Sequence, residues 1–485
     1  MQQVLQVFEW QSKMRLSVTR SLTLTRKALC PMKSASAKSD TAHLPANERA
    51  LLLCERALEL KDRGDFDRAR EVLRPFWEEF GERPDTKGLD PQVTGEILMC
   101  TGILTSWIGN QNQIREAHDW ARDLLTESIR FYEPTGDLKK VGQAQTEIAY
   151  CYFRSGAVDE ARIMFSDALE KLTFEGNARA NALLGLSVVA WSSSRYDEAL
   201  KILTDNSRLF RKIGSHILKG FYHNQLAMVL RSIAPAEKKT DYFRRAIKEY
   251  AEAEFEFKMA RNTLFRAEVQ NNVGFLLCKL ARFRQAHTYL NEARRLALLV
   301  RNKVVVAQID DTCAQVLIAE KKLTQAEAIA RAAVASLKKS GHQHVLADAM
   351  ITHGIALARL GKSNQAEFNF REAIRVAHEI GALNRAGLAA LTLIEEIDHL
   401  PPDVLAGAYQ QADEWLSNCQ SQELLLRFKA AGTKLALKLL REKGTEGSTQ
   451  ALFNMPIYLT GEIWKFEHAL ISQALGACRF KQLAN

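Results

Sequence analysis

Two short stretches contain residues that could do chemistry, and neither forms a complete site. Residues 360–363 read LGKS, like the end of a phosphate-binding loop. That loop needs a glycine five residues before its second glycine, and Ala356 occupies this place. Residues 341–344 read GHQH, which offers two histidines to a metal, but zinc takes three or four ligands and no third lies nearby in the sequence. We therefore expect both stretches to be turns.

No other pattern in the sequence points to catalysis. It contains no H-E-x-x-H metal motif, no G-x-S-x-G nucleophile motif and no dinucleotide-binding glycine motif. The 8 cysteines are far apart and form no C-x-x-C pair, which is typical of reduced thiols in a cytoplasmic protein. The sequence therefore favours a cytoplasmic protein that is not an enzyme and that uses no cofactor and no metal.

Positive charge is concentrated at the start of the chain. The formal net charge is +9 over 485 residues, and residues 1–45 contribute seven Lys and Arg against only Glu9 and Asp40. Because the rest of the chain is nearly neutral, the signal for nucleic-acid binding is weak. We expect residues 1–45 to be a disordered leader; the alternative is that the start codon is assigned too early and the true start is Met32. No apolar run approaches the roughly 18–20 residues of a membrane span.

A pattern of about 40 residues repeats through the middle of the chain. Each unit has an upstream helix with a small residue, then a short turn, then a second helix that opens with an alanine. In one unit Ala161, Phe165 and Ala168 share a face of the second helix. Small residues let two helices approach closely, and one pair alone leaves apolar surface bare, so the pairs must stack. The shared alanines are Ala69, Ala121, Ala161, Ala199, Ala246, Ala286, Ala326 and Ala366.

These units resemble the tetratricopeptide repeat (TPR) family over residues 46–400. The resemblance implies an all-α fold, a right-handed α-solenoid of about eight or nine helix pairs. The period of about 40 exceeds the usual one of about 34 and is similar to the long-helix repeats of bacterial regulators. The alternative is a helical bundle without repeats. The matching residues are Tyr152, Gly156, Val158, Ala161, Phe165 and Ala168; Gly274, Phe283, Ala286, Leu290 and Ala293; and Gly354, Leu357, Gly361, Ala366, Phe370 and Ala373.

The resemblance also implies a concave groove lined by the first helix of each repeat. Aromatic rings beside amides suit a protein or peptide ligand, since rings bury area and asparagine bonds to a peptide backbone. The alternative is that these residues only pack between helices. Some family members hold a terminal carboxylate with lysines, and those lysines are missing here. The implied groove residues are Tyr150, Phe153, Arg154, Asn181, Trp191, Phe221, Asn224, Arg231, Asn271, Phe275 and Gln315.

The end of the chain reads as a cap, a linker and an incomplete domain. Residues 401–443 form amphipathic helices that we expect to cap the array, and residues 444–460 read as a linker. Within residues 461–485, FEHALISQAL is similar to the first helix of a Fis-type helix-turn-helix. The helix that would enter the major groove is absent, so the domain looks truncated. The expected packing face of this remnant is Phe466, Leu470, Ile471 and Ala474.

Two hypotheses about function follow from the sequence. The first is a non-enzymatic scaffold that binds a protein or peptide in its groove, as the sensory part of a bacterial signalling or transcriptional regulator. The second is a DNA-binding transcriptional regulator with a TPR sensor, defective or fragmentary in this chain. If the remnant is a truncated DNA reader, we expect this product to bind DNA poorly or not at all. If it is a natural terminal helix, it caps the array instead.

Overall fold

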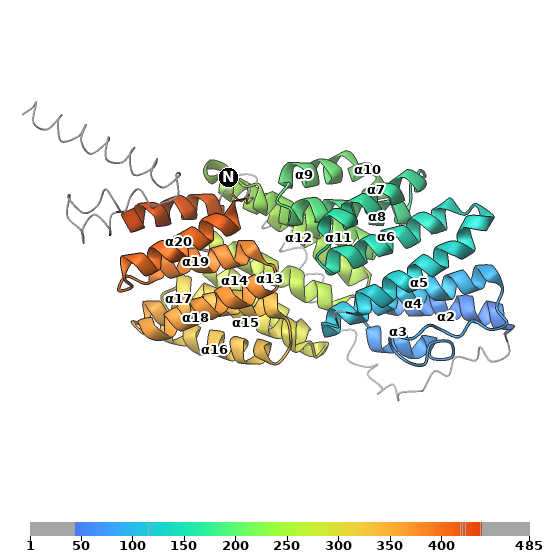
Figure 1. Cartoon of the computed structure of the whole chain (residues 1–485), viewed down its shortest axis with the longest axis horizontal. Coiled ribbons are helices and arrows are strands. Elements are labelled where there is room, and N and C mark those ends of the chain that lie inside the picture. Colours follow the sequence, from blue (N-terminus) through green and yellow to red (C-terminus); the bar gives the residue numbers. More distant parts are fainter. Residues whose placement is uncertain are drawn as a thin grey trace, which may run out of the picture. The chain divides into compact units, whose positions relative to one another are not determined.

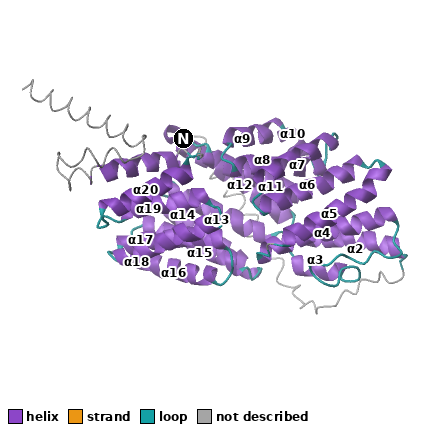
Figure 2. Ribbon diagram, viewed as in Figure 1, coloured by secondary structure: helices purple, strands orange, loops and turns teal. Residues whose placement is uncertain are grey.

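The structure, a computed structural model, describes residues 44–438 except 115, 418, 420, 422 and 437. The chain divides after Arg49 into two units, and residues 44–49 are the only described part of the first; the first described helix begins at Ala46. Every regular element in the described residues is a helix (Figure 2). None of these helices is both long enough and apolar enough to cross a membrane.

Several predictions from the sequence fall outside the described residues. They concern the leader up to residue 43, the linker at residues 444–460 and the helix-turn-helix remnant at residues 461–485. The four remnant residues Phe466, Leu470, Ile471 and Ala474 are among them. The contacts discussed below are those of residues 50–438.

Consecutive helices pack as pairs, and each pair lies beside the next one along the chain (Figure 1). Nine pairs follow one another in the described residues, which confirms the all-α solenoid of about eight or nine units. The short helix α10 (Ser207–Lys212), two 3-10 turns, η1 (Glu133–Thr135) and η2 (Ala236–Lys238), and a helix at residues 423–436 complete the fold. The pairs are α2 (Ala46–Asp62) with α3 (Phe66–Leu73), α4 (Pro91–Asn112) with α5 (Ala117–Tyr132), α6 (Leu138–Arg154) with α7 (Val158–Lys171), α8 (Asn177–Ser192) with α9 (Tyr196–Asp205), α11 (His216–Ser232) with α12 (Lys239–Met259), α13 (Thr263–Lys279) with α14 (Phe283–Leu299), α15 (Lys303–Ala319) with α16 (Leu323–Lys338), α17 (Gln343–Arg359) with α18 (Ser363–Glu379), and α19 (Leu383–Glu396) with α20 (Pro402–Leu416).

The repeat period is regular in the second half of the array. The first helices of four successive pairs begin at Thr263, Lys303, Gln343 and Leu383, each 40 residues after the last. Two earlier steps between the shared alanines are longer, 52 residues from Ala69 to Ala121 and 47 residues from Ala199 to Ala246. In the first step α4 extends to Asn112, and in the second η2 lies between α11 and α12. The additional residues therefore lengthen a helix or a connection and leave the pairing of helices intact.

Small residues occupy the crossings between the two helices of a pair. All eight shared alanines, from Ala69 to Ala366, have no exposed surface. The facing first helix often carries a glycine: a Cβ at Gly220 would lie 2.5 Å from the ring of Phe257, and one at Gly354 would lie 2.6 Å from the ring of Phe370. The aromatic ring of the second helix thus fills the space that the glycine leaves. This exchange of small for large holds the helices of a pair close together.

Two segments 200 residues apart touch, and we call this the closing contact. The side-chain N–H of Asn262 donates to the backbone oxygen of Asp62 at 2.9 Å, and Asn262 is completely buried. Nearby, the ring of Phe265 lies 6.4 Å from that of Trp107 and 4.8 Å from that of Phe221. The end of α2 therefore contacts the turn before α13. The closing contact thus joins the first of the helices α2, α4, α6, α8 and α11 to the pair that follows this row.

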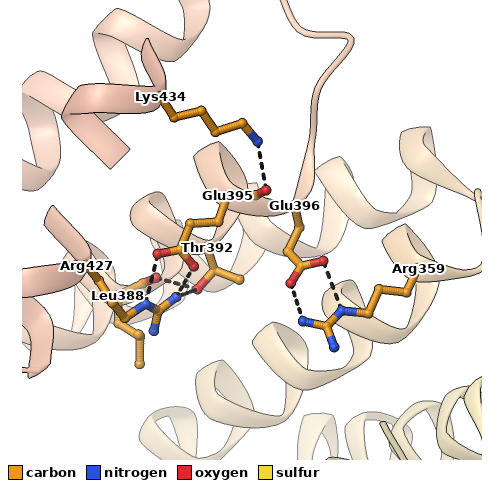
Figure 3. A network of polar contacts seen from close by, with 7 residues as sticks. All are labelled: Arg359, Leu388, Thr392, Glu395, Glu396, Arg427 and Lys434. Atoms are coloured by element: carbon orange, nitrogen blue, oxygen red, sulfur yellow. Dashed lines mark hydrogen bonds and ion pairs between the residues drawn. The ribbon is translucent and has the colours of Figure 1, made fainter. Parts of the chain in front are cut away.

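Ion pairs tie the last described helix to the array (Figure 3). Arg427 donates to both carboxylate oxygens of Glu395 at 2.9 and 2.6 Å and to the hydroxyl of Thr392 at 2.8 Å. Lys434 reaches the backbone oxygen of Glu395 at 2.8 Å. On the other side of α19, Arg359 of α17 pairs with Glu396 at 2.7 Å. Residues 423–436 therefore pack as a further helix on α19, within the region expected to cap the array.

Candidate functional site

The first helices of five pairs surround a pocket of about 520 Å³. Helices α2, α4, α6, α8 and α11 line it, together with the residues just before α11. Pockets of a few hundred to about 1,000 Å³ are typical of sites for small ligands. The closing contact lies beside it, because Asp62, Trp107 and Phe221 belong both to that contact and to the pocket wall.

Helix α6 shows how the sequence builds this wall. Asp137 begins the helix by accepting a hydrogen bond from the backbone N–H of Lys140 at 3.0 Å, as an N-cap residue does. Side chains spaced by three and four residues then share one helix face. That face points into the pocket with Lys140, Gln143, Glu147, Tyr150 and Arg154.

Five of the residues expected to line the groove meet in this pocket. They come from three first helices, with Tyr150 and Arg154 on α6, Asn181 on α8, and Phe221 and Asn224 on α11. Rings, amides and a guanidinium therefore lie around one space. This is the mixture of groups that the sequence suggested for a peptide-binding groove.

The other six expected residues lie outside this pocket, and all but Asn271 pack on or bond to other residues of the protein. Phe153 packs at the edge of the cluster around Phe165. The indole N–H of Trp191 donates to the hydroxyl of Ser232 at 2.9 Å. Arg231 lies over the ring of Phe275 at 5.4 Å. Further along, Gln315 donates to Asp311 at 2.9 Å, and Asn271 has a buried side-chain oxygen without a hydrogen bond to any described residue.

Several pocket residues were not among the predicted groove residues, because that prediction began with the third repeat, at Tyr150. Lys61 and Trp107 lie on the first helices of the first two pairs. The alanines Ala69 and Ala121 mark the second helices of those pairs. Applying the same repeat pattern to the first two pairs would therefore have predicted Lys61 and Trp107. Glu147 lies three residues before Tyr150 on the same face of α6, so the helix period could have identified it.

Most charged side chains in the pocket pair with one another. Lys61 lies 2.6 Å from Asp62, and Lys140 forms an ion pair with Glu96. Glu147 has an amide partner instead, because its Oε1 accepts a hydrogen bond from Asn181 at 3.1 Å. Burial raises the pKa of Glu147, although the nearby cations Lys61 and Arg154 act in the opposite direction.

Arg154 is held by two aromatic rings and a hydroxyl. Its guanidinium lies 4.5 Å from the ring of Trp107 and 5.3 Å from that of Tyr150, close enough for cation–π attraction. Its Nη1 donates to the hydroxyl of Ser106 at 2.8 Å. No carboxylate of the described residues forms an ion pair with it.

The groups behind Arg154 are neutral. The thiol of Cys151 donates to Ser106 at 3.3 Å, and Nδ1 of His118 lies 3.4 Å from the same hydroxyl. Burial and then the charges of Arg154 and Arg122 lower the pKa of His118 to about 4. Burial raises the pKa of Cys151 to about 11, so the thiol keeps its proton at neutral pH. This cluster therefore supports Arg154 and offers no activated nucleophile.

The two asparagines of the pocket differ in what they bond. Asn181 is engaged on both sides, because it donates to Glu147 and accepts from the hydroxyl of Tyr150 at 3.3 Å. Asn224 makes only a weak contact of 3.6 Å to the sulfur of Met228. Its amide is therefore the one that a ligand backbone can reach without displacing another partner.

The turns that could have carried chemistry are structural. Gly361 has a φ of +77° in the turn between α17 and α18, a conformation that favours glycine. His342 precedes α17, with its ring 6.4 Å from that of His344. In the part of the chain that the structure describes, no group of three or more His, Cys, Asp or Glu side chains is placed to hold a metal.

No model of a known protein family matches this sequence, and no curated protein matches it. Among solved structures, it is similar to a Rap protein complexed with competence and sporulation factor, with 13% identity over 86% of this chain and 99% of that chain and a TM-score of 0.48. The quorum sensor NprR from B. thuringiensis has 14% identity over 69% of this chain and 89% of that one, with a TM-score of 0.46. Yeast Tom70 has 14% identity over 81% and 83%, with a TM-score of 0.41. At these identities and TM-scores, none of them bears on what this chain binds.

Proposed function

We propose that this protein is a non-enzymatic scaffold that binds a peptide, or an extended segment of a partner protein, in the pocket between α2, α4, α6, α8 and α11. The single observation that carries the proposal is the convergence of Tyr150, Arg154, Asn181, Phe221 and Asn224 around one space. Rings bury apolar side chains of a ligand, and the free amide of Asn224 pairs with its backbone.

A role as a binding module also fits the chemistry of the pocket lining. The thiol of Cys151, which lies behind Arg154, is protonated at neutral pH, and His118 on the same side is neutral. Such groups do not activate a nucleophile. Nothing in residues 50–438 favours the alternative of a DNA-binding regulator, whose expected elements lie beyond the described residues, so we do not propose it.

A phage-displayed library of random dodecapeptides tests the proposal. The wild-type protein selects binders, and each enriched peptide is then measured by fluorescence polarisation against Asn224→Trp and Asn224→Ala. Asn224→Trp fills part of the pocket, and Asn224→Ala removes only the amide. The matched control is Lys201→Ala, which changes an exposed residue of the second helix α9.

We expect enriched peptides to bind the wild type and the Lys201→Ala variant equally. Binding to Asn224→Trp should be lost, and binding to Asn224→Ala should weaken by about tenfold, the effect of one buried hydrogen bond. Enriched peptides that bind Asn224→Trp as well as they bind the wild type would show that the pocket is not the site.

A further inference from the structure

We propose that the ligand of this pocket carries a carboxylate that pairs with the guanidinium of Arg154, next to an apolar group. The inference rests on the proposed binding function and adds the charge of the ligand to it. It is carried by the geometry around Arg154 and by the balance of charges in the pocket wall.

Two charged groups of the pocket wall have no ion-pair partner. Among the charged lining residues, Lys61 pairs with Asp62 and Lys140 with Glu96, and Arg154 and Glu147 are left over. Burial raises the pKa of Glu147 and so disfavours its charge, whereas a guanidinium keeps its proton in a protein. Arg154 is therefore the permanently charged group of the wall that forms no ion pair with a described residue.

The geometry leaves part of the guanidinium open to the pocket. Trp107 and Tyr150 hold it by its faces, and Nη1 is bound to Ser106. Its Nε and Nη2 make no hydrogen bond to any described residue. The N–H groups of these two atoms form the edge of the guanidinium that binds both oxygens of a carboxylate at once.

A second stacked arginine shows that stacking on a ring does not exclude an ion pair, although Arg231, which lies over Phe275, also forms none with a described residue. Arg122 on α5 lies 4.7 Å from the ring of Tyr152, much as Arg154 lies on Trp107. Arg122, however, forms an ion pair with Asp119. Arg154 lacks such a partner and lies in the wall of a pocket, where a partly desolvated charge gains most from an incoming anion.

The apolar part of the ligand has its own surface beside the charge. Leu184, Val188 and Phe221 line the same pocket from α8 and α11. A carboxylate with a neighbouring aliphatic or aromatic group would therefore use both sides of the pocket. Three sources have this chemistry: the C-terminus of a peptide, an acidic side chain within a peptide, and a small carboxylic acid.

Matched pairs of probes separate these sources. The first pair is a mixture of acetylated hexapeptides that end in leucine and contain no Asp or Glu, prepared as the free acid and as the amide. The second compares the amidated mixture with one that contains a single Glu. The third is 3-phenylpropionate with 3-phenylpropionamide. Retention of the peptides on immobilised full-length protein is measured by mass spectrometry, and binding of the small pair by isothermal calorimetry.

The protein variants are Arg154→Met, Arg154→Lys and, as matched control, Arg122→Met. We expect the wild type and Arg122→Met to prefer at least one acid over its neutral partner by about tenfold or more, the effect of a charge-assisted pair. Arg154→Met should lose this preference. Arg154→Lys keeps the charge without the two-pronged edge and should keep only part of the preference, so it remains a test if Arg154→Met does not fold.

The outcomes distinguish this inference from the proposed function. If hexapeptides bind and the acid and amide forms bind equally well to the wild type, the carboxylate is wrong and the peptide site stands. If only 3-phenylpropionate binds, and Arg154→Met abolishes it, the carboxylate site is right and the peptide ligand is wrong. If no acid is preferred in any pair, or if Arg154→Met keeps the preference, the inference is overturned.

Discussion

At the scale of single residues, the pocket contains groups that hold the wall together and groups that are free for a ligand. Asn181 belongs to the first kind, since it joins Glu147 to Tyr150. Asn224 and Arg154 belong to the second. The sequence placed all three in the groove and could not separate these roles, because roles depend on neighbours from other repeats.

The two asparagines give a direct prediction about stability. Asn181→Ala leaves the buried carboxyl of Glu147 without its amide donor, so it should lower the free energy of unfolding by about 1–3 kcal/mol. Asn224→Ala breaks only a weak contact to sulfur and should change it by less than about 0.5 kcal/mol. Urea unfolding followed by circular dichroism measures both. Equal losses in the two variants would contradict the assignment.

Glu268 on α13 predicts a dependence of stability on pH. Burial raises its pKa from the usual 4.5 to about 7, and no described residue pairs with it. The charged form is therefore disfavoured in the folded protein. Burying this charge lowers the free energy of unfolding. The loss is fully present above the folded pKa, decreases as the pH falls from about 7 towards 4.5, and is gone below that.

Replacing this carboxyl by an amide should remove that cost. We expect Glu268→Gln to be more stable than the wild type by about 1–3 kcal/mol at about pH 8, and equally stable at about pH 4. The control is Glu252→Gln, which changes an exposed residue of α12. Its difference in stability from the wild type should not depend on pH. An advantage of Glu268→Gln that is the same at both pH values would rule out titration as its cause.

At the scale of the elements, the fit of small residues to large ones sets how closely helices pack, between pairs as well as within them. Gly185 on α8 faces the ring of Phe165 on α7, in the preceding pair, so closely that a methyl group has no room. Gly407 on α20 is exposed and has nothing within 4 Å of its Cβ position. The same substitution should therefore have opposite effects at the two sites.

Gly185→Ala should destabilise the protein by about 1–3 kcal/mol, because overpacking outweighs the better helix propensity of alanine. Gly407→Ala should stabilise it by up to about 1 kcal/mol, because only propensity changes. Thermal and urea unfolding of both variants test this pair. Stabilisation by Gly185→Ala would mean that the two helices are not in close contact there.

At the scale of the whole molecule, the fold could be predicted from local patterns and the closing contact could not. Repeated alanines and a period of about 40 residues predicted about eight or nine helix pairs, because each unit carries the same small and large residues at the same places. The contact between Asn262 and Asp62 depends on the sum of all rotations between pairs. No residue near either partner indicates it. The repeat register did predict five residues of the pocket beside it, but not that the first helices of the first two pairs complete its wall.

The closing contact can be tested by comparing two helix caps. Asn262 caps α13 by accepting from the N–H of Phe265 at 2.9 Å and also reaches Asp62, whereas Asn302 caps α15 by accepting from Val305 at 3.0 Å. Asn262→Ala should lower the free energy of unfolding by about 1 kcal/mol more than Asn302→Ala does, because it removes a buried hydrogen bond besides the helix cap.

Hydrogen exchange locates the effect of these two substitutions. Asn262→Ala should speed the exchange of backbone amides in residues 60–66, which lie about 200 residues away in the sequence, and Asn302→Ala should leave them unchanged. If residues 60–66 exchange at the wild-type rate in Asn262→Ala, the contact does not hold the two segments together.

The most direct test of the account is to locate a bound peptide by photo-crosslinking. A peptide selected by the wild-type protein is prepared with a benzophenone side chain, irradiated in the complex and mapped by mass spectrometry. Our account predicts adducts on α6, α8 and α11, at residues around Tyr150, Val188 and Phe221. Adducts confined to second helices such as α16 or α18 would contradict it.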